Sequence, residues 1–342
     1  LIALAQGMQQ DMKGCIIDLR GNTGGYMAAA IQMVNEFLPK GEMIVYAEGE
    51  NTPRYADYAN GRGICQKLPI VVLTDETSAS ASEIFAGAIQ DNDRGTIIGR
   101  RTFGKGLVQQ PIEFADGSAI RLTIARYYTP SGRCIQKPYT NGHSEEYELD
   151  LLNRYEHGEF FIQDSIKQDE SIAYKTKNGR TVYGGGGIMP DILLTDSQKL
   201  DICYNLYRDH MFFDYATYYY RQHPTIAPAA DFQLTDSDIE DFCSYLDEKK
   251  FSYETETGRN LGELIKMAKQ EDIDSTLLAD LEALKPRFTV DYRAAIQRHR
   301  QEVEELLGGE IIKRYYYHRG YYAYMLRYDE QVPRAIEEIT KL

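Results

Sequence analysis

The first half of the chain alternates short apolar segments of strand length with longer segments of helical periodicity. This pattern limits the fold more than any other feature. Strands are predicted at 15–19, 43–47, 68–73 and 96–99, and helices at 1–12, 27–38 and 81–91. Strands that alternate with helices pair in parallel, because each helix carries the chain back across the sheet. We therefore expect an α/β domain with a largely parallel sheet.

In the rest of the chain the predicted secondary structure changes twice. Strands near 107–114 and 119–128, joined by Asp116-Gly117, form a predicted hairpin, and a polar, irregular excursion at about 131–182 leads to strand-like order at 184–192. From about residue 196 the pattern is helical: 196–223, 236–249, 260–269, 274–284, 289–306 and 309–328. We expect two domains, a core of residues 1–195 and an all-helical extension of residues 196–342.

Composition narrows the classes of partner. The net charge of −14 disfavours nucleic acid and anionic lipid, which both attract basic surfaces. The five cysteines are widely spaced, without a CxxC pair, so neither a disulfide framework nor a zinc site is expected. The chain starts at Leu1 in a segment that already looks helical. We expect an upstream part to be missing.

The densest chemical signal is Ser78-Ala-Ser-Ala-Ser-Glu83, between a predicted strand and a predicted helix. A hydroxyl of Ser80 at this junction would face the free N–H groups of the helix N-terminus, which suits a nucleophile whose attack creates an oxyanion. The competing interpretation is a helix cap, because Ser80 and Glu83 match a capping box. The local sequence by itself favours the cap.

A serine nucleophile needs a base, and histidine is an improbable one here. The six histidines lie in the polar excursion or in the helical region, away from the predicted strand ends. Lysine can replace histidine where burial favours its neutral form. Lys105, between Gly104 and Gly106, is the candidate, and Gln109 on the next strand could hydrogen-bond to it. Taken alone, Lys105 is better interpreted as a lysine of a surface turn, and Gln109 reads equally well as an exposed polar residue of a strand.

The segment Asp18-Leu-Arg-Gly-Asn-Thr-Gly-Gly25 also lies between a strand and a helix, where α/β folds place ligand sites. Glycines that open a helix can offer a backbone N–H to an oxyanion. A plain turn or a weak phosphate loop would read similarly. Because the segment is not GxGxxG and lacks a Walker lysine, nucleotide binding is not expected.

Four segments, in this order and spacing, resemble the C-terminal processing peptidases, which are also called tail-specific proteases. They are DLRGNTGG (18–25), TSASASEIFAGAIQD (77–91), GRRTFGKGLVQ (99–109) and GGGGIMPDI (184–192). The resemblance covers residues 1–195. It implies Ser80 as nucleophile, Lys105 as general base and Gln109 as the residue that orients Lys105. The implied oxyanion donors are the N–H groups of Ala81 and Gly25, with Gly24 as the alternative to Gly25.

The resemblance also implies a crotonase/ClpP-like core, partial at its N-terminus, with an upstream PDZ domain absent from this chain. It implies a serine endopeptidase that cleaves proteins near their C-termini without cofactor or metal. The helical region looks like the extension of bacterial members in the periplasm or cell envelope. Substrates would be proteins or peptides, not nucleic acids. A homo-oligomer and an envelope-associated adaptor are compatible with this family.

Two other classes of function stay open. A crotonase-type acyl-CoA enzyme would share the fold and the oxyanion glycines but would need neither a serine nucleophile nor the Lys105 loop. A non-catalytic scaffold would keep the motifs only as relics. The presence of Ser80, Lys105 and Gln109 together argues against the scaffold.

Overall fold

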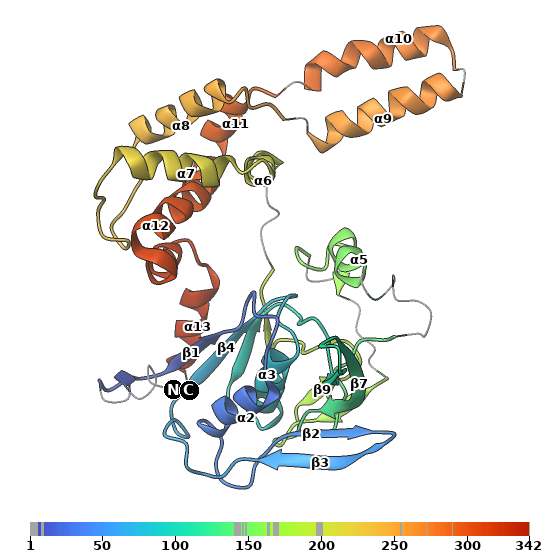
Figure 1. Cartoon of the computed structure of the whole chain (residues 1–342), viewed down its shortest axis with the longest axis vertical. Helices are drawn as coiled ribbons and strands as arrows, with labels where there is room; N and C mark the ends of the chain where they lie inside the picture. The colour runs from blue at the N-terminus through green and yellow to red at the C-terminus, as the bar shows by residue number, and fades with distance from the viewer. Residues whose placement is uncertain are drawn as a thin grey trace. The chain divides into compact units, whose positions relative to one another are not determined.

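The computed structural model describes residues 6–7, 10–139, 145, 147, 149–162, 165–166, 171–195, 201–253, 255–271, 273–288 and 290–341. The chain forms two compact units, 1–197 with 330–342, and 198–329 (Figure 1). The core is mixed α/β and the second unit is helical, as predicted. The division into domains at residues 1–195 and 196–342 remains a prediction. Of the helix predicted at 1–12, Gln6 and Gly7 are helical and most of the remainder lies outside the described residues.

A four-stranded parallel sheet forms one half of the first unit. Its order is β1 (Cys15–Asp18), β4 (Ile70–Thr74), β5 (Thr96–Gly99) and β10 (Ile192–Leu193). The helices α2 (Met27–Asn35) and α3 (Ala81–Asp91) follow β1 and β4 along the chain. The strand at 184–192 is shorter than predicted, since only its end joins the sheet.

Both faces of this sheet are covered, which explains its continuous apolar strands. Successive side chains of a strand point to opposite faces. Ile70 and Val72 therefore enter the core that α2 and α3 share, while Val71 and Leu73 enter a second cluster with Ala335. Ala335 lies on α13 (Gln331–Ile339), so the end of the chain covers the sheet face opposite α2 and α3 (Figure 1). The sequence analysis included these residues in the helical extension but predicted no separate helix at the position of α13.

The second sheet corrects the prediction of a largely parallel sheet. Its strands all pair antiparallel, in the order β3 (Thr52–Tyr58), β2 (Met43–Gly49), β7 (Ala119–Tyr128) and β6 (Leu107–Glu113). The hairpin β6–β7 is confirmed, but β3 was interpreted as a connection, because its alternating tyrosines and charges lack a buried face. Helix α3 shares one core with residues of both sheets, and all of its residues are buried. Its small side chains suit this crowded position.

The predicted excursion contains short elements. Helix α5 (Asp150–Glu156) and a two-stranded sheet of β8 (Ala173–Lys175) and β9 (Thr181–Tyr183) lie between β7 and β10. The β8–β9 hairpin is fastened to the end of α3, because Asp93 accepts hydrogen bonds from the N–H of Asn178 and from Arg180. Irregular sequence here still gives defined backbone structure.

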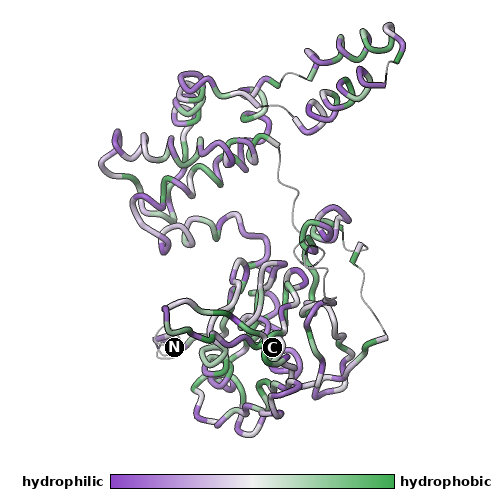
Figure 2. The backbone as a smooth tube through the Cα atoms, turned by 45° about the vertical axis from the view of Figure 1, so that its right-hand side comes forward, coloured by the Kyte–Doolittle hydropathy of each residue, from purple (hydrophilic) through white to green (hydrophobic). Residues whose placement is uncertain are grey.

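The second unit is built only of helices within the described residues. Its core is aromatic, with Phe212, Tyr215, Phe242 and Tyr324 almost fully buried. In Figure 2 hydrophilic and hydrophobic colours alternate along α9 and α10, as expected for amphipathic helices. The helices are α6 (Asp201–Arg208), α7 (Met211–Gln222), α8 (Asp236–Glu248), α9 (Glu256–Gln270), α10 (Ser275–Leu284), η2 (Lys285–Phe288), α11 (Tyr292–Arg298) and α12 (Arg300–Met325).

Candidate active site

The turn between β4 and α3 carries Ser80 in an unusual backbone conformation. Its φ of 56° and ψ of −114° lie where residues other than glycine are rarely found. Such conformations persist only where surrounding contacts enforce them, and they cluster at functional sites. The enforcing contacts include Ser78, whose buried hydroxyl donates to the carbonyl of Leu19 at 2.7 Å. The turn that presents Ser80 is thus tied to the start of DLRGNTGG, directly after β1.

Glu83 joins the Ser80 turn to the Lys105 loop. Its fully buried carboxylate accepts hydrogen bonds from the backbone N–H of Ser80 at 2.8 Å and of Lys105 at 2.9 Å, both on Oε2. On Oε1 it accepts from the N–H of Gly104 at 2.7 Å and the hydroxyl of Thr102 at 2.6 Å. Four donors from two distant segments therefore converge on one side chain.

The capping box predicted for Ser80 and Glu83 is present, but it forms only part of this arrangement. Burial raises the pKa of the Glu83 carboxyl, and the four hydrogen bonds that it accepts oppose this shift. The cap and the site interpretations are therefore compatible. The same glutamate can fix the helix start and hold the Lys105 loop.

Tyr127 of β7 provides a second link between the two segments. Its hydroxyl contacts the backbone carbonyl of Ser80 at 2.9 Å and also that of Lys105. The side chain is almost completely buried, and burial raises the pKa of the phenol well above its ordinary value. The phenol therefore stays protonated and acts as a hydrogen-bond donor. The N–H groups of both residues meet Glu83, and their carbonyls meet Tyr127.

The GGGGIMPDI segment packs directly on the Lys105 loop. The hydroxyl of Thr102 accepts a hydrogen bond from the N–H of Ile188 at 2.6 Å, while Gly187 adopts a φ of +86°. A Cβ on Gly187 would lie 2.6 Å from the carbonyl oxygen of Thr102. Only glycine allows this approach, so the fourth motif supports the loop that carries Lys105.

The DLRGNTGG segment lies against the other side of the Ser80 turn. The carbonyl of Asn22 accepts from the N–H of Ala79 at 3.1 Å and from the hydroxyl of Ser82 at 3.0 Å. Gly24 has a φ of +100°, and a Cβ there would lie 2.8 Å from both the Ala81 nitrogen and the Ser80 Cβ. The backbone of Gly24 is therefore in close contact with the nucleophile candidate.

The backbone N–H groups near Ser80 differ in their hydrogen bonding. The N–H of Gly24 donates to the Oδ1 of Asn22 at 2.9 Å. Within the part of the chain that the structure describes, the N–H groups of Gly25 and Ala81 form no hydrogen bond. Gly25 and Ala81 thus have donors to offer to a ligand, whereas Gly24 already uses its own.

The side chains of the predicted dyad are less closely associated than their backbones. Ser80 and Lys105 are both partly buried, and Gln109 is exposed on the edge strand β6. Among the described residues, no hydrogen bond joins the Ser80 hydroxyl to the Lys105 ammonium, or Lys105 to Gln109. A β-bulge between Val108 and Gln109 interrupts the strand at that point.

Sequence reasoning missed Tyr127 and Thr102 as part of this arrangement. Tyr127 lies in an ordinary strand pattern, and Thr102 precedes the Phe-Gly-Lys-Gly segment without any distinguishing spacing. Their roles depend on contacts across 47 residues for Tyr127 and Ser80, and 19 for Thr102 and Glu83. Glu83 had a local signal, the capping box, which indicated only one of the four hydrogen bonds that its carboxylate accepts.

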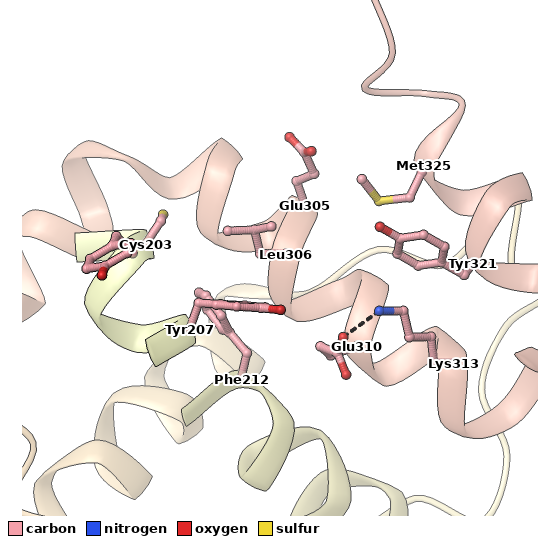
Figure 3. Close-up of a pocket in the computed structure, with 10 residues that line it drawn as sticks. Cys203, Tyr207, Phe212, Glu305, Leu306, Glu310, Lys313, Tyr321 and Met325 are labelled. Atoms are coloured by element: carbon pink, nitrogen blue, oxygen red, sulfur yellow. Dashed lines mark hydrogen bonds and ion pairs between the residues drawn. The ribbon is translucent and has the colours of Figure 1, made fainter. Parts of the chain in front are cut away.

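The helical unit contains a pocket of about 450 Å³ between α6 and α12 (Figure 3). Its lining is mainly aromatic and aliphatic, including Tyr207, Phe212 and Tyr321, and its lysine, Lys313, is paired with Glu310 at 2.6 Å. The lining residues include no serine or histidine. Across the described residues, no cluster of histidine, cysteine, aspartate and glutamate could hold a metal ion. The catalytic candidate therefore lies in the first unit.

Comparison with known proteins agrees with this assignment. Residues 2–145 match Peptidase family S41. This part of the chain belongs to the S41 peptidase family. The match contains the Ser80 turn, the Lys105 loop and DLRGNTGG. Residues 202–339 match a second family, described as "Probable PDZ-protease, C-terminal helical domain".

The S41 region is similar to several carboxyl-terminal processing proteases. The protein of that name from Synechocystis sp. is 44% identical over 135 residues, 40% of this chain and 31% of that protein. The carboxy-terminal processing protease CtpA of Bacillus subtilis is 37% identical over 175 residues, 48% of this chain and 37% of that protein. A solved photosystem II D1 C-terminal processing protease is 28% identical with a TM-score of 0.40, over 56% of this chain and 37% of that chain.

This chain therefore spans about a third of the length of the curated relatives that it matches. The S41 match ends at residue 145, before α5 and the β8–β9 hairpin. No helix in the described ranges is long and apolar enough to cross a membrane.

Proposed function

We propose that this chain carries the catalytic centre of a serine endopeptidase that uses a Ser80–Lys105 dyad. The observation that carries this proposal is the shared attachment of the two segments. The strained Ser80 turn and the Lys105 loop are bound to the same buried Glu83 and the same Tyr127 hydroxyl. Such sharing positions two backbones relative to each other with little freedom, as a nucleophile and its base require.

In the proposed reaction, neutral Lys105 accepts the proton of the Ser80 hydroxyl while Oγ attacks the carbonyl carbon of the scissile peptide. The N–H groups of Ala81 and Gly25 stabilise the oxyanion. Lys105 then donates the proton to the leaving amine, and an acyl-enzyme ester forms on Ser80. Water hydrolyses this ester with Lys105 again as the base, which restores the free serine. Gln109 would orient Lys105.

The unused N–H groups of Ala81 and Gly25 support this choice of oxyanion donors, and the engaged N–H of Gly24 favours Gly25 over Gly24. Because Glu83 and Tyr127 already hold the Ser80 and Lys105 backbones, we expect the dyad to form by rotation of the two side chains. The lysine side chain has the rotatable bonds for this movement.

The names of the relatives suggest the class of substrate. We propose cleavage of protein substrates near their C-termini, in a crotonase/ClpP-like core, by a bacterial protein of the periplasm or cell envelope. Capture of substrate by an upstream PDZ domain, and a homo-oligomer or adaptor, belong to the same proposal. No metal or cofactor enters the reaction.

The test compares Ser80→Ala and Lys105→Ala with Lys67→Ala, an exposed lysine outside the site. We expect casein cleavage, and reaction with a fluorophosphonate probe, to disappear in the first two variants and to stay at the wild-type level in the third. Circular dichroism should show an unchanged fold in all three. Cleavage that survives in Lys105→Ala would refute the dyad. Unlabelled Ser80 in the wild type would favour the crotonase-type alternative.

A further inference from the structure

The loop that carries Lys105 is held from its outer side by a segment beyond the S41 match. Arg154 of α5 is 6% exposed, although arginine is seldom buried without partners. Its Nη1 donates to the carbonyl of Thr102 at 3.1 Å, and its Nη2 donates to the carbonyl of Arg101 at 2.9 Å. One guanidinium thus bridges two successive carbonyl groups at the start of the loop.

Glu159 orients this guanidinium. Its buried carboxylate accepts from Nε of Arg154 at 2.9 Å and binds the Arg101 side chain through two hydrogen bonds, at 2.7 and 2.6 Å. Paired hydrogen bonds between arginine and a carboxylate are stronger than those between neutral groups, and they also fix the orientation of both side chains. Arg101 is therefore held through its side chain by Glu159 and through its carbonyl by Arg154.

A second contact joins the same two segments independently. Lys137, which is 5% exposed, donates to Asp150 of α5 at 3.1 Å and to the carbonyl of Tyr147 at 2.9 Å. Its ammonium lies 4.0 Å from the centre of the Phe103 ring. The backbone N–H of Lys137 donates to the carbonyl of Gly104 at 2.9 Å.

The donors on one side of the loop and the carbonyl groups on the other side therefore form hydrogen bonds with different partners. Glu83 accepts from donors of Thr102, Gly104 and Lys105 on the inner side. Arg154 donates to the carbonyls of Arg101 and Thr102 from the outer side. Removing Arg154 would leave two carbonyl groups in a buried region without their donors, which favours local opening of the loop.

We propose that Arg154, oriented by Glu159, is a positioning residue for the base loop at residues 101–105. Arg154 touches neither Ser80 nor Lys105 in any hydrogen bond of the described structure, and it acts through the loop backbone. This inference rests on the proposed function, because positioning of Lys105 matters for catalysis only if Lys105 is the base.

The experiment compares three variants of the 342-residue chain. Arg154→Met removes the guanidinium at similar length. Arg154→Lys keeps a charge beside Glu159 but lacks the planar fork that reaches two carbonyls. Arg121→Met is the matched control, because Arg121 is an exposed arginine of β7 whose side chain forms no hydrogen bond or ion pair among the described residues.

Two readouts separate positioning from stability. Amide hydrogen exchange of peptides that span residues 101–105 reports opening of the loop, and the rate of fluorophosphonate reaction reports activation of Ser80. We expect Arg154→Met to speed the exchange and to slow the reaction, each by roughly tenfold or more, since each lost hydrogen bond involves a charged group. Arg154→Lys should restore the melting temperature but not the reaction rate. Arg121→Met should match the wild type in every readout.

The outcomes are distinct. If exchange at residues 101–105 in Arg154→Met equals that in Arg121→Met, the positioning role is overturned, whatever the activity. If Arg154→Met does not fold, the decision falls to Arg154→Lys, and a wild-type reaction rate there overturns the proposal. If wild-type Ser80 fails to react with the probe, the proposed function fails, while the exchange readout still decides whether Arg154 holds the loop.

Discussion

Replacement of Glu83 by glutamine tests whether one carboxylate holds the Ser80 turn and the Lys105 loop, the two proposed catalytic segments, together. The carboxylate accepts from Ser80 and Lys105 on Oε2, and from Thr102 and Gly104 on Oε1. Glutamine has nearly the same shape, but one oxygen becomes an amide nitrogen that donates. Two of the four donors must then face another donor.

The expected loss in the free energy of unfolding follows from the two possible orientations of the glutamine amide. With nitrogen in place of Oε2, the N–H groups of Ser80 and Lys105 both lose their acceptor. With nitrogen in place of Oε1, only the N–H of Gly104 loses its acceptor, because the Thr102 hydroxyl accepts from Ile188 with one lone pair and can accept from the amide with the other. An unsatisfied buried donor costs about 1–3 kcal/mol, so the preferred second orientation predicts a loss of about 1–3 kcal/mol.

The assay is urea denaturation followed by circular dichroism, since the chain has no tryptophan for fluorescence. Glu50→Gln, at an exposed position of the first unit, is the matched control. We expect Glu83→Gln to stay folded in the absence of urea and still to lose most of its peptidase activity. The reason is that both the Ser80 turn and the Lys105 loop lose a fixed partner. If Glu83→Gln proves as stable and as active as Glu50→Gln, the role assigned to the four hydrogen bonds is refuted.

Three further substitutions address separate contacts. Tyr127→Phe keeps the ring but leaves the carbonyl of Lys105 without the Tyr127 hydroxyl, while the carbonyl of Ser80 still accepts from the N–H groups of Glu83 and Ile84. We expect about 1–3 kcal/mol lower stability in urea and slower probe reaction, and an unchanged reaction rate would contradict the link. Gly24→Ala should cost at least about 1–2 kcal/mol from its positive φ alone, with added clash against the Ser80 turn, whereas Gly262→Ala, in open space, should be tolerated. Burial alone would raise the pKa of Asp93, but hydrogen bonds from Asn178 and Arg180 outweigh it and lower the pKa. Asp93 therefore stabilises the fold above about pH 4, and this contribution is lost as the pH falls. Asp93→Asn should weaken the acid dependence of the unfolding free energy, and an identical pH profile would count against this ion pair.

Many helices and strands of the first unit were predictable because the sequence patterns that produce them are local. Helix α3 has the predicted bounds, as do β5 and β7, since each has a clear apolar period and a defined start. Strand β3 escaped prediction because its exposed and half-exposed residues give no buried face to detect. Apart from the β6–β7 hairpin, the antiparallel pairing of the second sheet was not predicted, because it depends on how strands distant in the chain meet.

The candidate site divides in the same way. Order and spacing of the four motifs were enough to indicate Ser80, Lys105 and the glycines near them. The contacts that hold the Ser80 turn and the Lys105 loop in place could not be predicted. Tyr127 and Arg154 make them through hydrogen bonds to segments far away in the chain. Neither residue belongs to a recognisable local pattern.

The sequence by itself determined most of the local elements and indicated the candidate chemistry at their ends, because hydrophobic period, capping and glycine positions act over a few residues. Only the tertiary structure decided that Glu83 serves two segments at once, and that α13 covers the outer face of the parallel sheet. These results depend on the three-dimensional packing of the core. A buried carboxylate needs donors from wherever the fold brings them, and an apolar sheet face is covered by whichever apolar helix reaches it.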